Sequence, residues 1–299
     1  MIAEKKNILI TGARGLIGSA LVRRLKLDDR YNIIEGTREW CDVTKPIQGN
    51  ETYHYIIHAA SNAAPKAFAE TPVEVMMSNI LGVKNLLDYG KEHGMERFLF
   101  ISTGEVYGEG DGRVFEEDYQ GYVNPLSARS CYPSSKRAAE TLCAAYAKEY
   151  GIDFIVARPC HVYGPGFTEN DNRVYAQFIR NVLRGENIVM KSTGEQMRSW
   201  CYVEDCVSGI LTILEKGVSG EAYNIADETS TVSIRELAEM IADIAGKKVI
   251  MQLPEEAEKA GYNPVTKSVY STKKLRALGW TLQGTMREKL RDTIKASTI

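Results

Sequence analysis

The stretch TGARGLIGS, residues 11–19, decides the fold that this sequence encodes. It follows residues 7–10, NILI, which are typical of a buried strand, and it opens a segment with apolar residues at helical spacing. Glycines at three-residue intervals suit a turn in which the backbone approaches a pyrophosphate and the helix N-terminus binds it. We therefore predict a dinucleotide site with these contacts: Gly12, Arg14, Gly15, Leu16, Ile17 and Gly18.

The first half of the chain alternates short apolar runs with amphipathic segments of helical period. This β-α-β pattern predicts an α/β fold with a doubly wound parallel sheet of the Rossmann type. Beyond the first strand and its helix over residues 15–25, we expect strands at residues 31–34, 55–58, 97–101 and 153–157, and helices at residues 73–92 and 134–150.

The second half of the chain is richer in loop signals, with glycines and prolines that divide it into short segments, and this pattern predicts a smaller C-terminal substrate domain. Helices are expected at residues 175–184 and 234–245, the second opened by a capping box from Ser233 to Glu236. The segment 203–215 is expected to pack back on the first domain. The predicted boundaries are 1–162, with about 200–225, for the dinucleotide domain, and 163–199 with 226–299 for the substrate domain.

Composition limits the partners and the compartment. A net charge of −2 and a pI near 6.2 favour neither nucleic acid nor an anionic membrane as a partner. The six cysteines form no C-x-x-C pair and the four histidines show no ligand spacing, so we predict reduced thiols and no metal. We expect a cytoplasmic protein, because neither a signal peptide nor a membrane span is recognisable.

The end of the second strand favours NADP over NAD. The stretch NIIEGTR, residues 32–38, has Gly36 where an acid usually accepts the ribose hydroxyls, and Glu35 is expected on the other face. Arg38 and Arg14 suit a 2′-phosphate, whereas a solvated Arg38 would leave NAD as the cofactor. Further contacts with the dinucleotide are expected from these residues: Asp42, Val43, Ala59, Ala60 and Ser61.

Catalytic residues are predicted where the strand FLFI, residues 98–101, ends in polar residues. Tyr132 and Lys136 lie four positions apart, on one face of a helix. A tyrosine acting as a base needs its pKa lowered by about 3 units, or about 4 kcal/mol, which Lys136 and an oxidised nicotinamide could supply. Thr103 would hold the substrate oxygen, and Ser102 beside it is expected to contact the substrate.

These residues resemble the extended short-chain dehydrogenase/reductases that act on nucleotide sugars. The resemblance covers nearly the whole chain through these stretches, in order: TGARGLIGS, SNILGVKNLL, ISTGEVYG, YPSSKRAAE, RPCHVYGPG, MRSWCYVEDC and EAYNIADE. It implies catalytic roles for Thr103, Tyr132 and Lys136, and often a homodimer formed through the helices near 73–92 and 134–150. It places further residues as follows: Asn79, Pro159 and Cys160 near the cofactor, and Arg173 and Arg198 near the substrate diphosphate.

Within this family the chain looks most like UDP-glucuronate decarboxylases and 4,6-dehydratases over residues 169–206. The dehydratases carry an Asp-Glu pair after Ser-Thr, whereas this chain has Gly104 and Glu105, so ordinary dehydration is not expected. The resemblance makes Glu105 the candidate for the step that follows oxidation. The GTR stretch looks instead like GDP-fucose synthases. His161 is either a substrate contact or a packed loop histidine.

The resemblance implies an enzyme that transiently oxidises a sugar hydroxyl, most simply at C4, and then epimerises or decarboxylates the nucleotide sugar. An NADPH-dependent keto-sugar reductase is the alternative that Arg14 and Arg38 favour. A non-catalytic dinucleotide-binding protein is a third alternative, against which the intact set of Thr103, Tyr132 and Lys136 argues.

Overall fold

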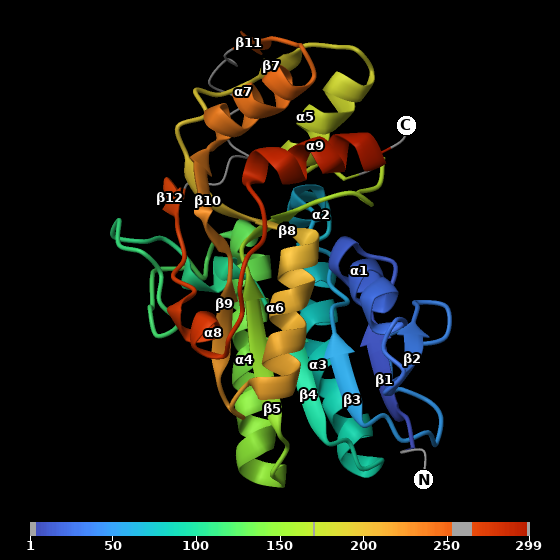
Figure 1. The fold of residues 1–299 in the computed structure, drawn as a ribbon. Coiled ribbons are helices and arrows are strands. Elements are labelled where there is room, and N and C mark those ends of the chain that lie inside the picture. The colour runs from blue at the N-terminus through green and yellow to red at the C-terminus, as the bar shows by residue number, and fades with distance from the viewer. Residues whose placement is uncertain (1–3, 170, 253–264, 298–299) are drawn as a thin grey trace.

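A computed structural model describes residues 4–169, 171–252 and 265–297 of the chain (Figure 1). The strands are β1 (Lys6–Thr11), β2 (Tyr31–Gly36), β3 (Tyr55–His58), β4 (Arg97–Ile101), β5 (Phe154–Pro159), β6 (His161–Tyr163), β7 (Ile188–Met190), β8 (Met197–Tyr202), β9 (Ala222–Ile225), β10 (Asp227–Ser233), β11 (Val249–Met251) and β12 (Lys267–Ser268). The α-helices are α1 (Leu16–Leu25), α2 (Pro65–Glu70), α3 (Pro72–Glu92), α4 (Cys131–Tyr150), α5 (Val174–Leu183), α6 (Val203–Lys216), α7 (Ile234–Ile244), α8 (Lys273–Ala277) and α9 (Met286–Ala296). Two short 3-10 helices are η1 (Gly104–Tyr107) and η2 (Ala128–Ser130).

The central sheet has the strand order β2-β1-β3-β4-β5-β9, and all of its neighbouring strands are parallel. This confirms the predicted doubly wound α/β fold. The strands read as apolar runs because both faces of the sheet are covered. In β4, for example, Phe98, Leu99 and Phe100 have no exposed surface.

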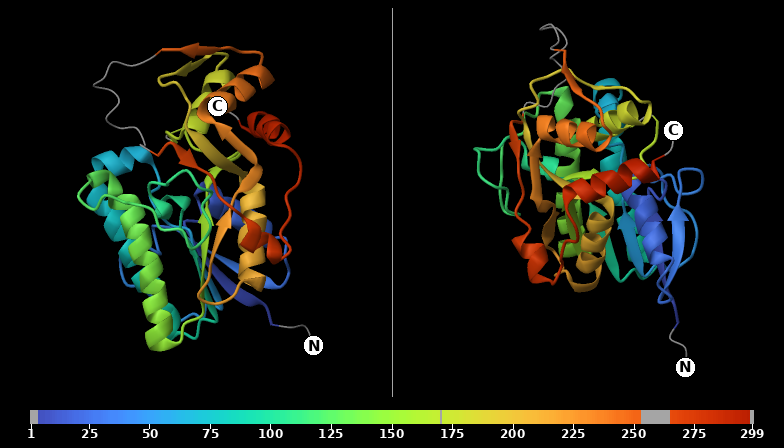
Figure 2. Two further views of the ribbon diagram at one scale, coloured as in Figure 1. Left: turned by 90° about the vertical axis from the view of Figure 1, so that its left-hand side faces the viewer. Right: turned by 45° about the horizontal axis from the view of Figure 1, so that its top comes forward.

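Helices cover both faces of this sheet (Figures 1 and 2). On one face, α1 and α6 pack with the sheet in a core that contains Leu21, Ile57 and Ile210. On the other face, α3 and α4 pack through Leu86 and Cys143. The expected return of segment 203–215 to the first half of the chain is thus confirmed, because α6 shares its core with α1.

A second layer lies over the carboxyl ends of the central strands (Figure 1). In its larger sheet β8 pairs antiparallel with β10 and parallel with β12 and β6, and a separate two-stranded sheet pairs β11 with β7 in parallel. Helices α5, α7 and α9 share a core with β8 through Phe178, Trp200, Leu237 and Leu290. The capping box of α7 is confirmed, since Ser233 and Glu236 bond each other's backbone N–H. The domain boundaries stay a prediction, and residues 253–264 of the predicted substrate domain lie outside the described residues.

The sequence analysis missed the edge strand β9 and the helix α9. β9 has only four residues, AYNI, which is too short for a periodic pattern. The start of α9 carries a second capping box, Thr285 to Glu288, whose T-x-x-E pattern was available in the sequence. Over the described residues, the helices are too short or too polar to cross a membrane.

Candidate active site

The turn between β1 and α1 lies where the chain changes direction in the sheet. β1 pairs with β2 on one side and β3 on the other, and sheets of this type bind ligands at such a point. Gly12 has a φ of 72°, and a Cβ on it would lie 2.7 Å from the Ala59 carbonyl carbon and the Ala60 nitrogen. A Cβ on Gly18 would overlap the Gly12 carbonyl oxygen. Glycine is therefore required at both positions.

The N-terminus of α1 is arranged to receive an anion. Its N-cap residue, Gly15, provides no side-chain cap, and its first turn, which begins with Leu16 and Ile17, contains no acidic residue. The uncapped N–H groups and the helix dipole favour a negatively charged group. The cradle of glycines and free N–H groups therefore fits the pyrophosphate of a dinucleotide.

Charged residues gather beyond β2. Arg38 is exposed and has no ion pair among the described residues. Arg14 pairs with Glu39 at 2.5 Å, and hydrogen bonds from Thr37 and Arg14 lower the pKa of Glu39 to about 2. Sequence analysis did not identify Glu39. Because its carboxylate pairs with Arg14, it would compete with a cofactor phosphate for that guanidinium. Glu35 makes its ion pair elsewhere, with Lys26.

Asp42 and Val43 follow in the next loop, where protein groups already contact them. The Asp42 carboxylate accepts hydrogen bonds from the Thr44 hydroxyl and N–H, which lower the pKa of Asp42. Val43 is buried, and its carbonyl accepts a hydrogen bond from Asn85 at 2.9 Å. Their contact with a cofactor stays a prediction.

Asn79 connects the end of β3 to the catalytic turn of α4. The Ser61 hydroxyl donates to Asn79 Oδ1 at 2.8 Å, and Asn79 Nδ2 donates to the Ser135 hydroxyl at 2.9 Å. Ser135 in turn donates to the backbone carbonyl of Tyr132 at 3.1 Å. Because Asn79 is fully buried, this chain of bonds fixes the predicted cofactor-binding segment relative to Tyr132.

Thr103, Tyr132 and Lys136 come together at the carboxyl end of β4. Thr103 is the N-cap of η1, where its hydroxyl accepts a hydrogen bond from the Glu105 N–H at 3.2 Å, and it lies close enough to Tyr132 to act on the pKa of that phenol. Tyr132 and Lys136 are both buried in the first turns of α4. The Lys136 ammonium donates to the Ile101 carbonyl at 2.8 Å and lies 5.9 Å from the centre of the Tyr132 ring. The arrangement can exchange a proton with a hydroxyl bound beside Thr103.

Burial dominates the pKa values of both titratable groups. It raises the pKa of Tyr132, as does Glu105, while Thr103 and the charges of Arg129 and Arg173 act in the opposite direction. Burial also lowers the pKa of Lys136 to about 7. In the protein chain alone, desolvation of Tyr132 outweighs the neighbouring cations, and the fall in its pKa expected with a bound oxidised nicotinamide stays a prediction.

Gly104 and Glu105 occupy η1, directly after Thr103. A Cβ on Gly104 would lie 2.5 Å from the Tyr270 ring carbon Cζ, so Tyr270 fills the space that a side chain at position 104 would need. Tyr270 is buried, and its hydroxyl bonds the Ser268 hydroxyl at 2.6 Å. The Glu105 carboxylate is paired with Arg129. Sequence analysis found neither Tyr270 nor Arg129, because each is far from its partner along the chain.

Ser102 belongs to a buried polar network on the other side of the strand end. Its hydroxyl donates to Glu140 at 2.5 Å, Glu140 pairs with Arg158 at 2.6 Å, and Arg158 donates to the Tyr107 hydroxyl at 2.9 Å. Successive residues of an extended segment point in opposite directions, so Ser102 faces this network while Thr103 faces Tyr132. The Ser102 hydroxyl thus donates its proton within this network, and its contact with a substrate stays a prediction.

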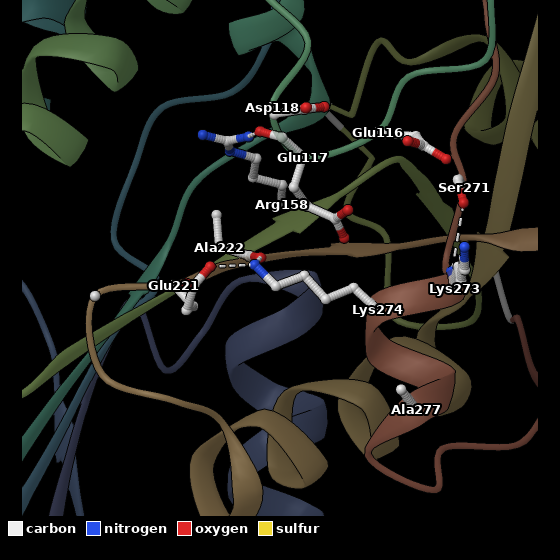
Figure 3. A pocket seen from close by; sticks show the side chains of 11 residues that line it. Glu116, Glu117, Asp118, Arg158, Glu221, Ala222, Ser271, Lys273, Lys274 and Ala277 are labelled. Carbon is white, nitrogen blue, oxygen red and sulfur yellow. Dashed lines mark hydrogen bonds and ion pairs between the residues drawn. The ribbon is translucent and has the colours of Figure 1, made fainter.

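A surface cavity of about 600 Å³ borders this network (Figure 3). Loop residues 116–118, the start of β9 and α8 line it, and Arg158 forms part of its wall. Lys274 pairs with Glu221 within it (Figure 3). No residue predicted for catalysis or cofactor binding lines this cavity, so it is separate from the candidate active site.

Arg173 and Arg198 are the cations near the catalytic group. Arg173 acts on the pKa of Tyr132, and its guanidinium pairs with Asp171 at 2.5 Å. Arg198 is 4% exposed and acts on the pKa of His161. Its guanidinium donates to the carbonyls of residues 197 and 265, and it has no carboxylate partner in the described part of the chain. Arg198 is therefore the buried cation best able to bind an anionic substrate group.

His161 pairs with Trp200 across β6 and β8, and the two ring centres lie 5.4 Å apart. Burial lowers the pKa of His161 to about 3, so the ring is neutral near pH 7. Its Nδ1 atom is buried without a hydrogen-bond partner among the described residues. These contacts favour a packed neutral histidine over a titrating one, although the open nitrogen leaves a substrate contact available.

Pro159 and Cys160 follow β5 at the same end of the sheet. Pro159 is buried, and the Cys160 N–H donates to the Ile225 carbonyl at 3.0 Å. Burial raises the pKa of the Cys160 thiol, which makes it a neutral packing group. Their contacts with the cofactor stay a prediction.

A glycine turn at the switch point of a parallel sheet, together with a tyrosine and a lysine one helical turn apart, defines the short-chain dehydrogenase/reductase class. The chain belongs to the NAD dependent epimerase/dehydratase family, whose model matches residues 8–226. This confirms the resemblance to extended enzymes that act on nucleotide sugars.

Individual relatives narrow the comparison. UDP-glucuronic acid decarboxylase 5 of Arabidopsis thaliana is 33% identical over 306 residues, covering 95% of this chain and 87% of the relative. A UDP-glucose 4-epimerase from Thermotoga maritima, solved with UDP-glucose, has a TM-score of 0.82 at 27% identity and covers 97% of this chain and 98% of its own. RMD from Pseudomonas aeruginosa, complexed with NADPH, has a TM-score of 0.82 at 26% identity and covers 98% and 99%. The protein is an enzyme of this family.

Proposed function

We propose that this protein transiently oxidises the C4 hydroxyl of a UDP-linked uronate and then decarboxylates it or inverts C4. The similarity to UDP-glucuronic acid decarboxylase 5 supports the substrate class. The observation that carries the proposal is the buried Tyr132, with Thr103 close enough to act on its pKa, in a site where the buried cation Arg198 also interacts with Glu105. Such a site combines a proton acceptor for a hydroxyl with a counter-ion for an anionic sugar nucleotide.

The chemistry follows from the positions of these groups. Tyr132 accepts the C4 hydroxyl proton, and Thr103 holds the substrate oxygen in line. A dinucleotide held at the β1–α1 turn would supply a nicotinamide able to accept the C4 hydride and give it back. A C4 ketone lies β to the uronate carboxylate, so its oxygen takes up the electron pair released when the C5–C6 bond breaks and carbon dioxide leaves. A proton then adds at C5, and Tyr132 gives its proton back to the C4 oxygen when the ketone is reduced.

Glu105 is assigned to the step between the two hydride transfers, and Arg198 and Arg173 to the substrate diphosphate. Tyr132→Phe is expected to abolish turnover of UDP-glucuronate, because no base then remains at C4. Glu105→Gln is expected to allow the first oxidation and to accumulate reduced nicotinamide and the keto sugar, which mass spectrometry would detect. Wild-type turnover in Glu105→Gln would refute the role of Glu105 without touching that of Tyr132.

For the cofactor, we propose a preference for NADP over NAD. Arg38 would bind the 2′-phosphate of NADP, and Arg14 would join it after breaking its ion pair with Glu39. Arg38 is exposed and has no ion pair among the residues described, and guanidinium groups bind phosphate bidentately. Arg38→Ser is expected to weaken NADP about tenfold or more with little effect on NAD. Glu39→Gln is expected to tighten NADP, because it frees Arg14. Calorimetric titration with both dinucleotides measures this, and unchanged ratios of NADP to NAD affinity in both variants would refute the role of these arginines in cofactor choice.

A keto-sugar reductase is the second candidate, favoured by Arg14, Arg38 and the likeness to RMD, which was solved with NADPH. The two candidates differ in redox balance. A reductase consumes one NADPH for each sugar reduced, whereas the enzyme proposed first returns its hydride and leaves the cofactor unchanged.

We also propose a homodimer formed through the exposed sides of α3 and α4. Val73 and Met77 are 72% and 44% exposed, and with half-buried Leu81 they form an apolar stripe at i, i+4, i+8 on α3. Light scattering on a sizing column should give twice the chain mass, and Met77→Glu should lower the measured mass.

We also propose a cytoplasmic location. The six thiols are free and five of them are buried, which agrees with this proposal.

A further inference from the structure

An arginine missed by sequence analysis holds the Glu105 carboxylate. Arg129 Nη2 lies 3.1 Å and 3.0 Å from the two oxygens of Glu105. Arg129 belongs to η2, directly before the turn of α4 that carries Tyr132. The side chains of Arg129 and Glu105 are 34% and 29% exposed, so water screens the pair only in part.

The ring of Phe68 joins this ion pair to the catalytic tyrosine. The guanidinium carbon of Arg129 lies 4.6 Å from the centre of the Phe68 ring. Phe68 also stacks on Tyr132, with ring centres 4.7 Å apart and an angle of 23° between the planes. Because Phe68 is buried in α2, it fixes both neighbours in place. Contacts therefore run without a break from Glu105 to Tyr132.

We propose that Arg129 is a positioning residue that holds Glu105 beside Tyr132 and balances its charge while Tyr132 ionises. The charged groups that face Tyr132 come from four segments: Glu105 in η1, Arg129 in η2, Lys136 in α4 and Arg173 before α5. When Tyr132 loses its proton, a second anion forms near Glu105, and like charges disfavour each other. Among the three cations, Arg129 is the one paired with Glu105, since Arg173 pairs with Asp171 and Lys136 donates to a carbonyl.

Removing Arg129 should therefore make the phenolate harder to form. The carboxylate of Glu105 would remain near Tyr132 without its partner, and abstraction of the sugar proton would require a higher pH. This inference rests on the proposed function, because it takes Tyr132 as the base.

The test is the pH dependence of the first hydride transfer, followed as reduced nicotinamide in a single turnover of the cofactor-loaded enzyme with UDP-glucuronate. The rate of this step should rise with pH as Tyr132 loses its proton. In Arg129→Met this ascending limb of the pH–rate profile should shift to higher pH by about one unit, so the rate at a pH below the limb should be about tenfold lower. Arg129→Lys keeps the cation and should recover most of this loss. Arg129→Met combined with Glu105→Gln removes both charges and should return the limb toward its wild-type position.

Arg113→Met is the matched control, because Arg113 also pairs with a carboxylate, Asp111, and lies 5.4 Å from an aromatic ring, Tyr119, but on an exposed loop. Its limb should not move. An unmoved limb in Arg129→Met, or a double variant displaced as far as the single one, would overturn the inference. If Arg129→Met does not fold, the same shift of the ascending limb is measured in Arg129→Gln. Wild-type turnover in Tyr132→Phe would instead refute the proposed function.

Discussion

Tyr270 explains why position 104 carries no side chain. The backbone of Gly104 is not left-handed, so the requirement for glycine is steric and comes from the buried phenol of Tyr270. The residue before Glu105 is thereby coupled to a residue 166 positions away, just before α8. A carboxylate at position 104, as in the 4,6-dehydratases that the chain resembles, has no room beside this phenol.

Gly104→Ala is therefore expected to destabilise the protein by about 1–3 kcal/mol through overpacking. In a Tyr270→Ala background the same change should cost much less, because the added methyl group enters the space left by the phenol. Urea unfolding of the two single variants and the double variant measures this coupling. Equal costs in both backgrounds would show that Tyr270 is not the obstacle.

Lys136 should make stability depend on pH. Burial holds its folded-state pKa at about 7, below the unfolded value of 10.5, so the unfolded chain binds more protons between these values. The free energy of unfolding therefore rises with pH in this window. The wild type should gain about 2 kcal/mol in its free energy of unfolding between about pH 7.5 and about pH 9.5, and Lys136→Met should lack this gain. Urea titrations at both pH values measure the difference, and parallel behaviour of the two proteins would contradict the shift.

At the residue scale, sequence predicted the groups whose spacing is local. Tyr132 and Lys136 are one helical turn apart, so their shared face follows from helix geometry. Strand alternation places the Ser102 side chain opposite that of Thr103, and the predicted substrate contact of Ser102 stays a prediction. Arg129 and Tyr270 had no local signal, since their partners are set by how distant segments pack.

At the scale of elements, the β1–α1 unit is the part of the cofactor site that sequence defined best. The contact between Gly18 and the Gly12 carbonyl sets the distance from helix to strand. The strand β9 was missed, because four residues carry no usable period and the pairing of β9 with β5 depends on the whole sheet.

Gly18→Ala should displace α1 and weaken dinucleotide binding by at least about tenfold, because the new methyl group overlaps the Gly12 carbonyl. Gly15→Ala separates the two roles of the turn, since its Cβ would lie 3.3 Å from the same oxygen and disturbs the helix position less, so a loss of affinity there reports contact with the dinucleotide itself. Calorimetric titration with NAD and NADP compares the two variants. Equal affinity in Gly18→Ala and wild type would contradict the proposed role of the turn.

At the scale of the whole molecule, a buried charge cluster connects α9 to α6, which covers the central sheet, and to β10 of the second layer. Lys289 of α9 lies 2.6 Å from Asp205 of α6 and 3.5 Å from Asp227 of β10. All three residues are at most 7% exposed. Sequence could not show this cluster, because its members are spread over more than eighty positions.

Lys289→Met is expected to cost about 3–5 kcal/mol of stability, because it leaves two buried carboxylates without a cation. Adding Asp205→Asn should recover part of the loss by removing one of these charges. Urea unfolding near neutral pH measures both variants. A cost below about 1 kcal/mol for the single variant would mean that the cluster is balanced by other groups.

The central claim is a redox cycle that begins and ends at C4 of a UDP-linked uronate. The most direct measurement uses UDP-glucuronate carrying deuterium at C4, incubated with the purified enzyme and dinucleotide and analysed by mass spectrometry and absorbance. The account predicts a UDP-pentose, or the C4 epimer, that retains the deuterium, with no net change in reduced nicotinamide. Stoichiometric consumption of NADPH, or a product without deuterium at C4, would contradict it.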